Sequence, residues 1–326
     1  MKNKGVALIT VMLVVALAAI LATQMLARLQ LQLQRTTNIN YNQQAYWYAL
    51  GAEAFAQRVL LKAIEDEPDV TKLSQDWAQG ETSYPVDFGQ ITGEIIDLQA
   101  CLNLNALRVE KESNDPGTVK NPARDALKLL IADLSVEGIG EYEAAEMADA
   151  LVDWLDADSS IVSPQGAEDN DYASKEFAYL PPNNFIAGLS ELRLVEHFTL
   201  PVIEALKPYV CVLPNTERHE ININTLTSEQ SALLAALLDI TQADAEQLIS
   251  AREEDGYDKI EDFFATPEFG KLSVNDDLKK QLVVDSEYFK LKSSASFNDS
   301  FFAMSSVFKV EDNKKVHVVS RKIGKE

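Results

Sequence analysis

The feature that most constrains this chain is an uncharged, mostly apolar run of 22 residues close to the amino terminus. It extends from Val6 to Ala27 and follows Lys2, Lys4 and Gly5. A helix of this length spans about 33 Å, which matches a hydrocarbon core of about 30 Å. The two lysines favour a cytoplasmic position for that end, so the body of the chain is expected on the other side of the membrane.

The helical pattern continues beyond the apolar run. Between Arg28 and Lys62 there is no proline and only one glycine, Gly51, and apolar residues recur at helical spacing. A single helix from residue 6 to about residue 62 would be about 85 Å long. Its first half would lie in lipid and its second half would pack on a soluble domain. A membrane helix followed by a separate helix is the alternative.

Three interpretations of the amino terminus compete. A cleaved secretory signal peptide needs a small-residue cleavage site after the apolar run, and Leu21-Ala22-Thr23 and Met25-Leu26-Ala27 provide a poor one. A plain membrane anchor needs no special leader. A short basic leader that ends in glycine, followed by an apolar helix that is retained, is typical of type IV pilin-like proteins, and Gly5 fits this third interpretation.

The fifth residue after Gly5 bears on the position of such a subunit in a fibre. Pilin-like subunits usually carry glutamate there, whereas this chain carries Thr10. In a fibre core the carboxylate would neutralise the terminal ammonium of the neighbouring subunit ahead, because an unpaired buried charge costs several kcal/mol. A subunit with no neighbour ahead needs no such carboxylate. Thr10 therefore suggests a tip subunit, and a lipid-facing residue without special meaning is the alternative.

Strand-like runs lie at both ends of the body and are separated by about 180 residues of helical pattern. The runs are 82–88, 91–98, 288–297, 301–310 and 316–322, with turn residues at Gly89-Gln90, Asn298-Asp299 and Asp312-Asn313. The pattern predicts an α+β fold, in which a pilin-like long N-terminal helix packs on an antiparallel sheet. A large all-helical domain would be inserted in the sheet domain.

The expected organisation has four parts. A leader at 1–5 precedes a transmembrane and fibre-core helix at 6–27. The pilin-like domain comprises 28–102 and 286–326, and the inserted helical domain comprises 103–285.

The inserted region contains a weak internal repeat. The segments 102–107 (LNLNAL) and 221–226 (ININTL) each precede two predicted helices, at 122–135 and 141–156 and at 228–239 and 242–254. The two units resemble helix-hairpin-helix (SAM-like) modules of DNA-binding proteins. The hairpin of the second unit has no glycine and carries an added acid, Asp239. A role in packing or protein interaction is therefore favoured over binding to DNA phosphate groups.

Charge is distributed unevenly along the chain. Residues 1–52 hold four of the 29 basic residues and none of the 51 acidic ones, so residues 53–326 carry 25 − 51 = −26. A body this acidic repels phosphate backbones, so no nucleic acid is expected as a partner.

Cys101 and Cys211 are the two cysteines of the chain and lie in no C-x-x-C pair. In an exported protein they would form one disulfide that closes a loop of about 110 residues, worth up to about 4.5–5 kcal/mol. Two buried free thiols are the alternative. The three histidines are scattered, and no G-x-S-x-G, H-E-x-x-H, Walker or dinucleotide motif occurs. The sequence therefore gives no support to an enzyme.

Six carboxylates lie within 19 residues and form a candidate metal site. They are Asp153, Asp156, Asp158, Glu168, Asp169 and Asp171. Oxygen ligands without cysteine or histidine favour calcium or magnesium over zinc, and calcium is favoured outside the cytosol. The spacing is not that of an EF-hand, because Ile161 stands where the loop needs glycine. A solvated acidic loop is the alternative.

These segments together resemble the general secretion pathway protein K family, the large minor pseudopilins of type II secretion systems. The resemblance covers essentially the whole chain. It rests on Gly5 with the five residues after it and on the segments 101–107, 151–158, 166–169, 189–192 and 221–225.

The resemblance implies a processing route, a location and a set of partners. A prepilin peptidase would cleave between Gly5 and Val6 and methylate the amino group of Val6. The chain would be a single-pass protein of the bacterial inner membrane with a periplasmic body and bound calcium. With two other minor pseudopilins it would cap a fibre of the major pseudopilin and nucleate its assembly, for export of folded proteins across the outer membrane. A membrane-anchored periplasmic DNA-binding receptor is the alternative function.

Overall fold

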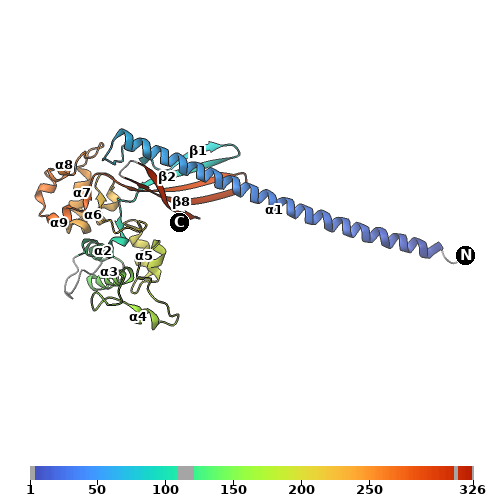
Figure 1. Ribbon diagram of the computed structural model, residues 1–326, viewed down its shortest axis with the longest axis horizontal. Helices are drawn as coiled ribbons and strands as arrows, with labels where there is room; N and C mark the ends of the chain where they lie inside the picture. The colour runs from blue at the N-terminus through green and yellow to red at the C-terminus, as the bar shows by residue number, and fades with distance from the viewer. Residues whose placement is uncertain (1–3, 109–120, 312–314, 325–326) are drawn as a thin grey trace.

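The computed structural model describes residues 4–108, 121–311 and 315–324 (Figure 1). Helix α1 runs from Lys4 to Asp66 without interruption, which confirms a single long helix. Figure 1 shows that its first half extends away from the body, while its second half lies along the sheet. The absence of proline from this segment permits the unbroken hydrogen-bond ladder.

Five antiparallel strands form the sheet, in the order β1-β2-β7-β8-β9. Their bounds are Thr82–Val86, Gly89–Asp97, Tyr288–Phe297, Ser300–Val310 and Val316–Ile323. The five predicted strands and the α+β fold are thus confirmed, because β2 and β7 pair across the helical insertion. The turn predicted at Gly89-Gln90 is wrong: these residues begin β2, and the chain turns at Asp87-Phe88. The turn expected at Asp312-Asn313 lies outside the described residues.

Small side chains let α1 approach the sheet closely. Ala45, Ala49 and Ala56 of α1 are buried on the side of the helix that faces the sheet. Farther along, Leu60 packs with Phe289 and other apolar residues of β7 and β8. The sheet has this apolar face because alternate residues of a strand point to the same side.

One charged group is buried in this contact. Glu53 of α1 accepts hydrogen bonds from Arg321 Nε at 2.9 Å and Arg321 Nη2 at 2.6 Å, and from Ser306 Oγ at 2.5 Å. Burial opposes ionisation, but the bonds from Arg321 and Ser306 outweigh it and lower the pKa of Glu53. The ion pair therefore fixes the helix against β8 and β9.

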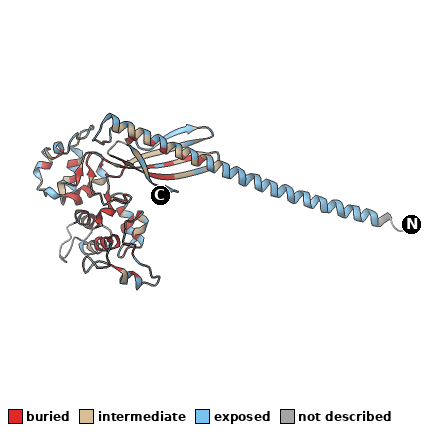
Figure 2. Cartoon of the chain, in the orientation of Figure 1, coloured by how far each residue is buried: buried red, intermediate tan, exposed pale blue. Residues whose placement is uncertain are grey.

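The segment between β2 and β7 is largely helical, and most of its buried side chains form one continuous core. Its helices are α2 (Pro122–Asp133), α3 (Glu141–Leu155), α4 (Asp169–Ala173), α5 (Leu200–Leu206), α6 (Ser231–Leu238), α7 (Gln242–Ser250), α8 (Ile260–Phe264) and α9 (Asp276–Lys279). Short 3-10 helices are η1 (Asp76–Ala78), which lies before the sheet, η2 (Leu104–Leu107), η3 (Leu189–Arg193), η4 (Ser228–Gln230) and η5 (Phe269–Lys271). Figure 2 shows buried residues concentrated in this segment and an exposed first half of α1.

The internal repeat has a structural role in both units. In the first unit β3 (Leu102–Asn103) pairs in parallel with β4 (Val210–Cys211), and in the second unit β5 (Ile221–Asn222) pairs in parallel with β6 (Leu282–Val283). In each unit, therefore, a two-residue strand at the start of the unit pairs with a two-residue strand near the end of the same unit.

Buried asparagine side chains reinforce these bridges. Asn103 Nδ2 donates to the carbonyl oxygens of Thr216 and Arg218, both at 3.0 Å. Asn222 Nδ2 donates to the Thr71 carbonyl oxygen at 3.0 Å, so the second bridge is also tied to the segment after α1. These asparagines of the repeat thus close the helical units.

A disulfide joins Cys101 to Cys211, with the two Cα atoms 5.7 Å apart and 110 residues apart in sequence. It lies beside the β3–β4 bridge, so the pairing expected from the sequence is present and ties the first helical unit to the end of β2.

A fully buried carboxylate marks the seam between the sheet and the insertion. Asp97, at the end of β2, accepts hydrogen bonds from Thr225 Oγ1 at 2.5 Å and from Ser286 Oγ and the Gln99 amide at 2.7 Å. Burial raises the pKa of Asp97 to about 6, although these bonds act in the opposite direction. Sequence analysis missed this residue, because its partner Thr225 is 128 residues away.

Candidate metal centre and fibre-forming helix

The first half of α1 is an apolar surface that the described residues of the body leave exposed. Val6, Leu13 and Met25 are 62%, 66% and 73% exposed. The helix from Val6 to Asp66 is long and apolar enough to cross a membrane, by length and composition. Such a surface requires lipid or other apolar helices around it.

The residues expected at a leader-cleavage site lie at the start of this helix. Gly5 and Val6 fall in its first turns. Thr10 follows one turn later, and its hydroxyl donates to the Ala7 carbonyl oxygen at 2.9 Å. Its donor is therefore used within its own helix, and the side chain carries no charge.

Three of the six acidic residues in the candidate metal site meet in space. Asp153 and Asp156 lie near the end of α3, and Glu168 precedes α4. One carboxylate oxygen from each of the three lies within 4.8 Å of the other two, and all three residues are buried. This arrangement has the ligand type and the separation that a divalent cation bridges.

Asp153 shapes the loop that carries the third carboxylate. Its Oδ1 accepts from the Val162 amide at 2.8 Å and its Oδ2 accepts from the Ala167 amide at 2.9 Å. A Cβ added at Gly166 would lie 1.9 Å from Asp153 Oδ2, so the loop requires glycine at this position. These contacts place Glu168, which follows Ala167, beside α3.

A bound cation would explain why the side chain of Glu168 is buried. Both of its carboxylate oxygens are buried, and neither accepts a hydrogen bond from a described residue. Leaving a buried carboxylate unpaired costs several kcal/mol, so such groups are normally paired or bound to a metal. The residues of this site therefore fit a hard cation.

The electrostatics of the cluster agree with this geometry. Burial raises the pKa of Asp153 to about 7, and the charges of Asp156 and Glu168 act in the same direction. Burial and then the charge of Asp156 raise the pKa of Glu168 to about 7. Like charges held together without water favour the protonated forms, and a divalent cation would reverse that preference.

The other three predicted ligands have different surroundings. Asp158 Oδ1 accepts from the Ser160 amide at 2.8 Å, and Asp171 Oδ2 accepts from the Glu168 amide at 2.9 Å. Asp169 accepts a long bond of 3.5 Å from the Ser159 hydroxyl. The structure therefore groups Asp153, Asp156 and Glu168, while Asp158, Asp169 and Asp171 organise the loop and the start of α4.

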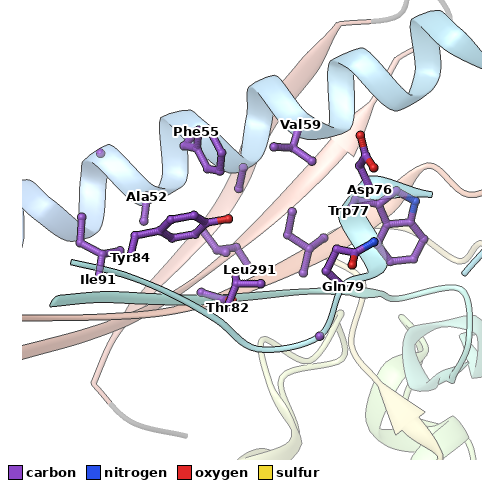
Figure 3. A pocket seen from close by; sticks show the side chains of 15 residues that line it. Ala52, Phe55, Val59, Asp76, Trp77, Gln79, Thr82, Tyr84, Ile91 and Leu291 are labelled. Atoms are coloured by element: carbon purple, nitrogen blue, oxygen red, sulfur yellow. The ribbon is translucent and has the colours of Figure 1, made fainter. Parts of the chain in front are cut away.

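An apolar hollow of about 300 Å³ lies away from this site, between α1 and the β1–β2 hairpin. Figure 3 shows Phe55 and Val59 of α1 on one side and Tyr84 and Ile91 of the hairpin on the other. The described residues that line it include one carboxylate, Asp76, and no cluster of titratable groups. The hollow therefore contributes no candidate for catalysis.

Two family models, both described as type II secretion system (T2SS), protein K, match residues 100–215 and 221–285. Type II secretion system protein K of Aeromonas hydrophila is 38% identical over 97% of this chain and 96% of its own length. That of Klebsiella pneumoniae is 34% identical over 99% of this chain and 97% of its own length.

A solved structure agrees with these matches. The GspK-GspI-GspJ complex from the type 2 secretion system of enterotoxigenic Escherichia coli contains a chain that superposes with a TM-score of 0.79 at 32% identity. The match covers 90% of this chain and 100% of that one.

The long helix on an antiparallel sheet, with its large helical insertion, defines a pilin-like subunit of the minor pseudopilin class. The sequence matches extend over nearly the full length of the chain, so they identify a family within this class. The chain belongs to the type II secretion system protein K family.

Proposed function

We propose that this chain occupies the tip of the type II secretion pseudopilus, where it nucleates fibre assembly together with two other minor pseudopilins. The fibre beneath it, built of the major pseudopilin, would serve the export of folded proteins across the outer membrane. The complex of the solved relative with GspI and GspJ supports partners of this kind.

The observation that carries the proposal is the neutral side chain of Thr10. Its hydroxyl is bonded to Ala7 of the same helix, so it offers no negative charge to the amino terminus of a subunit ahead. An ammonium group packed there without a carboxylate would be a buried, unpaired charge. A subunit that has no neighbour ahead avoids this cost.

The location of the inserted domain also supports a position at the tip of the fibre. Figure 1 shows it at the end of the sheet opposite to the exposed start of α1. A helical fibre grows by packing α1 of one subunit beside α1 of the next. A bulky domain at the far end is compatible with the last position of such a stack.

Cleavage after Gly5 and methylation of Val6 are part of the proposal. The apolar helix would then stay in the inner membrane until assembly, and the body would lie in the periplasm. The substitution Gly5→Ala tests this route, because the proposed cleavage site directly follows this glycine. Leader removal and secretion should both stop while the soluble body stays folded. Normal processing and secretion by this variant would contradict the proposal.

We also propose that calcium binds to Asp153, Asp156 and Glu168. The cation would neutralise the three carboxylates and join the end of α3 to the start of α4. Support comes from the buried, unpaired oxygens of Glu168 and from the separation of the carboxylates.

Calorimetric titration of the full chain with calcium chloride, after chelation, tests the cation site. We expect one or more bound calcium ions, and at least a tenfold loss of affinity in Glu168→Gln. The matched control is Glu176→Gln, an exposed acid farther along the chain, which should leave the affinity unchanged. Equal affinities in the two variants would contradict the assignment.

A further inference from the structure

Gly51 lies within the second half of α1, where the fold of the chain itself does not require a glycine. Glycine is among the least favourable residues in a helix interior, because it has the most backbone freedom to lose. A Cβ added at Gly51 would meet no atom within 4 Å among the described residues outside its own stretch of helix. By contrast, a Cβ added at Gly89 would collide with the Ser296 carbonyl oxygen. The close approach of a group from outside the chain would give Gly51 a role.

Large apolar side chains flank Gly51 on the surface of α1. Trp47 lies one turn before it and Phe55 one turn after it, and these side chains are 62% and 55% exposed. Residues spaced by four share one stripe of a helix. We name Trp47, Gly51 and Phe55 the glycine notch. A large, small, large order along one stripe makes a depression into which a side chain of a facing helix fits.

The glycine notch opens into the apolar hollow between α1 and the β1–β2 hairpin. Gly51 and Phe55 both line this hollow, whose volume is about 300 Å³ (Figure 3). The rings of Phe55 and Tyr84 meet edge to face with their centroids 5.7 Å apart. Trp77 lies at one end, and its Nε1 donates to Gln75 Oε1 at 2.8 Å. The notch and the hollow therefore form one continuous apolar surface.

Small residues on both sides leave the hollow unfilled by the described chain. Gly51 and Ala52 of α1, Gly80 before β1 and Gly93 of β2 all line it. The volume is many times the 10–15 Å³ or so that one water molecule requires. Apolar walls that only water covers cost free energy in proportion to their area. A large apolar side chain from outside would remove that area from water.

The chemistry of the lining favours an apolar occupant over a charged one. Asp76 is the one charged residue among the described residues that line the hollow, and it is exposed at the end beside Trp77. Thr82 Oγ1 donates to the Gly93 carbonyl oxygen at 3.2 Å, so its hydroxyl is used within the hairpin. Most of the remaining lining is ring and aliphatic carbon.

We infer that the glycine notch and the hollow receive a bulky apolar side chain from an α-helix of a second minor pseudopilin, which lies beside α1. The inference rests on the proposed function, because it names a contact within the proposed complex of minor pseudopilins. The solved relative is in a complex with GspI and GspJ. Glycine lets two helix backbones approach more closely than any other residue, which gives Gly51 a reason to be there.

The position of the notch on α1 agrees with this occupant. The exposed apolar first half of α1 requires lipid or other apolar helices around it. Gly51 lies about 36 Å beyond Ala27 along the same helix. A partner helix of similar length that packs on the first half therefore reaches the notch when it continues along α1.

A lipid chain and a second copy of this chain are less suitable occupants. The headgroup layer adds about 5–8 Å on each side of the hydrocarbon core, so a bilayer around Val6 to Ala27 ends well before Gly51. The proposed tip position holds one copy of the chain, so no second copy lies beside it.

Photo-crosslinking in cells that hold the intact secretion system tests the inference. The photoreactive residue p-benzoylphenylalanine replaces Tyr84, whose ring is at the rim of the hollow and 46% exposed. We expect a covalent adduct with an apolar residue in the N-terminal helix of another minor pseudopilin, mapped by mass spectrometry of the joined peptides. The matched control replaces Tyr142, an exposed tyrosine of the inserted domain, and should give no such adduct. An adduct with lipid or with a second copy, or no adduct at Tyr84, would overturn the inference.

Substitutions at Gly51 separate a role in binding from a role in folding. The association of the full chain with the two other minor pseudopilins is measured in detergent. Gly51→Leu should weaken it at least tenfold, and Gly51→Ala should weaken it less. The melting temperature of the Gly51→Ala chain alone should stay equal or rise, because alanine is the better helix former. Association of Gly51→Leu equal to that of the parent, or a lower melting temperature for Gly51→Ala, would overturn the inference.

A pair of phenylalanine substitutions locates the contact. Phe55→Ala should weaken association at least fivefold, whereas Phe177→Ala, which removes an 81% exposed ring of the inserted domain, should weaken it less than twofold. Equal losses would overturn the inference. If the parent chain associates and neither Gly51 nor Phe55 matters, the inference fails and the proposed function stands. If the parent chain does not associate with the other minor pseudopilins, both fail.

Discussion

The sheet domain and the inserted domain are stabilised in different ways. The sheet pairs β2 with β7 across the whole insertion and packs against a helix whose first half is exposed. The inserted domain closes each helical unit with a two-residue parallel bridge and buried asparagines. It also holds the buried carboxylates of Asp153, Asp156 and Glu168 and most of the negative charge. Under the proposed function, fibre assembly would belong to α1 and the sheet, and cation binding would belong to the insertion.

Loss of the disulfide should have the largest effect and should fall on the inserted domain. The double substitution Cys101→Ser, Cys211→Ser opens a loop of 110 residues. We expect the free energy of unfolding of the inserted domain to fall by about 4 kcal/mol.

Urea unfolding followed by tryptophan fluorescence distinguishes the two domains. In a chain carrying Trp47→Phe and Trp77→Phe, the remaining Trp154 reports unfolding of the insertion. In a chain carrying Trp47→Phe and Trp154→Phe, the remaining Trp77 reports unfolding of the sheet domain. A loss confined to the Trp77 signal would contradict the assignment of the disulfide to the first helical unit.

Asp97 should couple the two domains in a pH-dependent way. Its pKa is raised from its ordinary value of 3.8 to about 6. The native state therefore retains a proton that the unfolded state loses, so this group makes stability fall as the pH rises from about 4 to about 7, by up to about 3 kcal/mol.

The substitution Asp97→Asn mimics the protonated side chain and should remove this contribution to the pH dependence. Unfolding is measured between pH 4 and pH 8 with excess calcium, so that the cation site contributes equally to parent and variant. Identical pH profiles for the two chains would show that Asp97 is ionised throughout.

A substitution at Gly166 should affect the inserted domain alone. The added methyl group of Gly166→Ala meets Asp153 Oδ2 at 1.9 Å, so the loop must move and carry Glu168 with it. Calcium affinity should fall at least tenfold in calorimetry. Gly270→Ala is the control, because no atom lies within 4 Å of its added Cβ. A similar affinity for both variants would show that the loop is not part of the site.

The smallest effect is expected on the exposed surface of α1. Lys62 and Asp66 form an i,i+4 ion pair whose side chains are 66% and 60% exposed. Solvent and salt screen such pairs, so Lys62→Ala should leave the melting temperature essentially unchanged. A clear decrease would mean that the end of α1 is held by charge rather than by its apolar packing on the sheet.

The elements that were predictable from sequence are those with a local signal. The long helix follows from the absence of proline, and the five strands follow from alternating runs bounded by turn residues. The short bridges β3 to β6 were not predictable, because two residues carry no periodicity and their partners are far away in sequence. Helices α4, α5, α8 and α9 were also missed, since they have only five, seven, five and four residues.

The candidate cation site was predictable as a segment but not as a geometry. The helical positions of Asp153 and Asp156 place them near one another, whereas the approach of Glu168 depends on the loop that Asp153 organises. The sequence could not distinguish Glu168 from its neighbour Asp169, because only the fold buries the first carboxylate and leaves the second partly exposed.

Mass spectrometry of the mature protein tests the central claim that the apolar helix is retained as the fibre-forming segment. We predict a mature chain that begins at Val6, carries one methyl group on its amino nitrogen and has Cys101 bonded to Cys211. A mature chain that begins after Ala27 would contradict the account, because the surface that enters the fibre would then be absent.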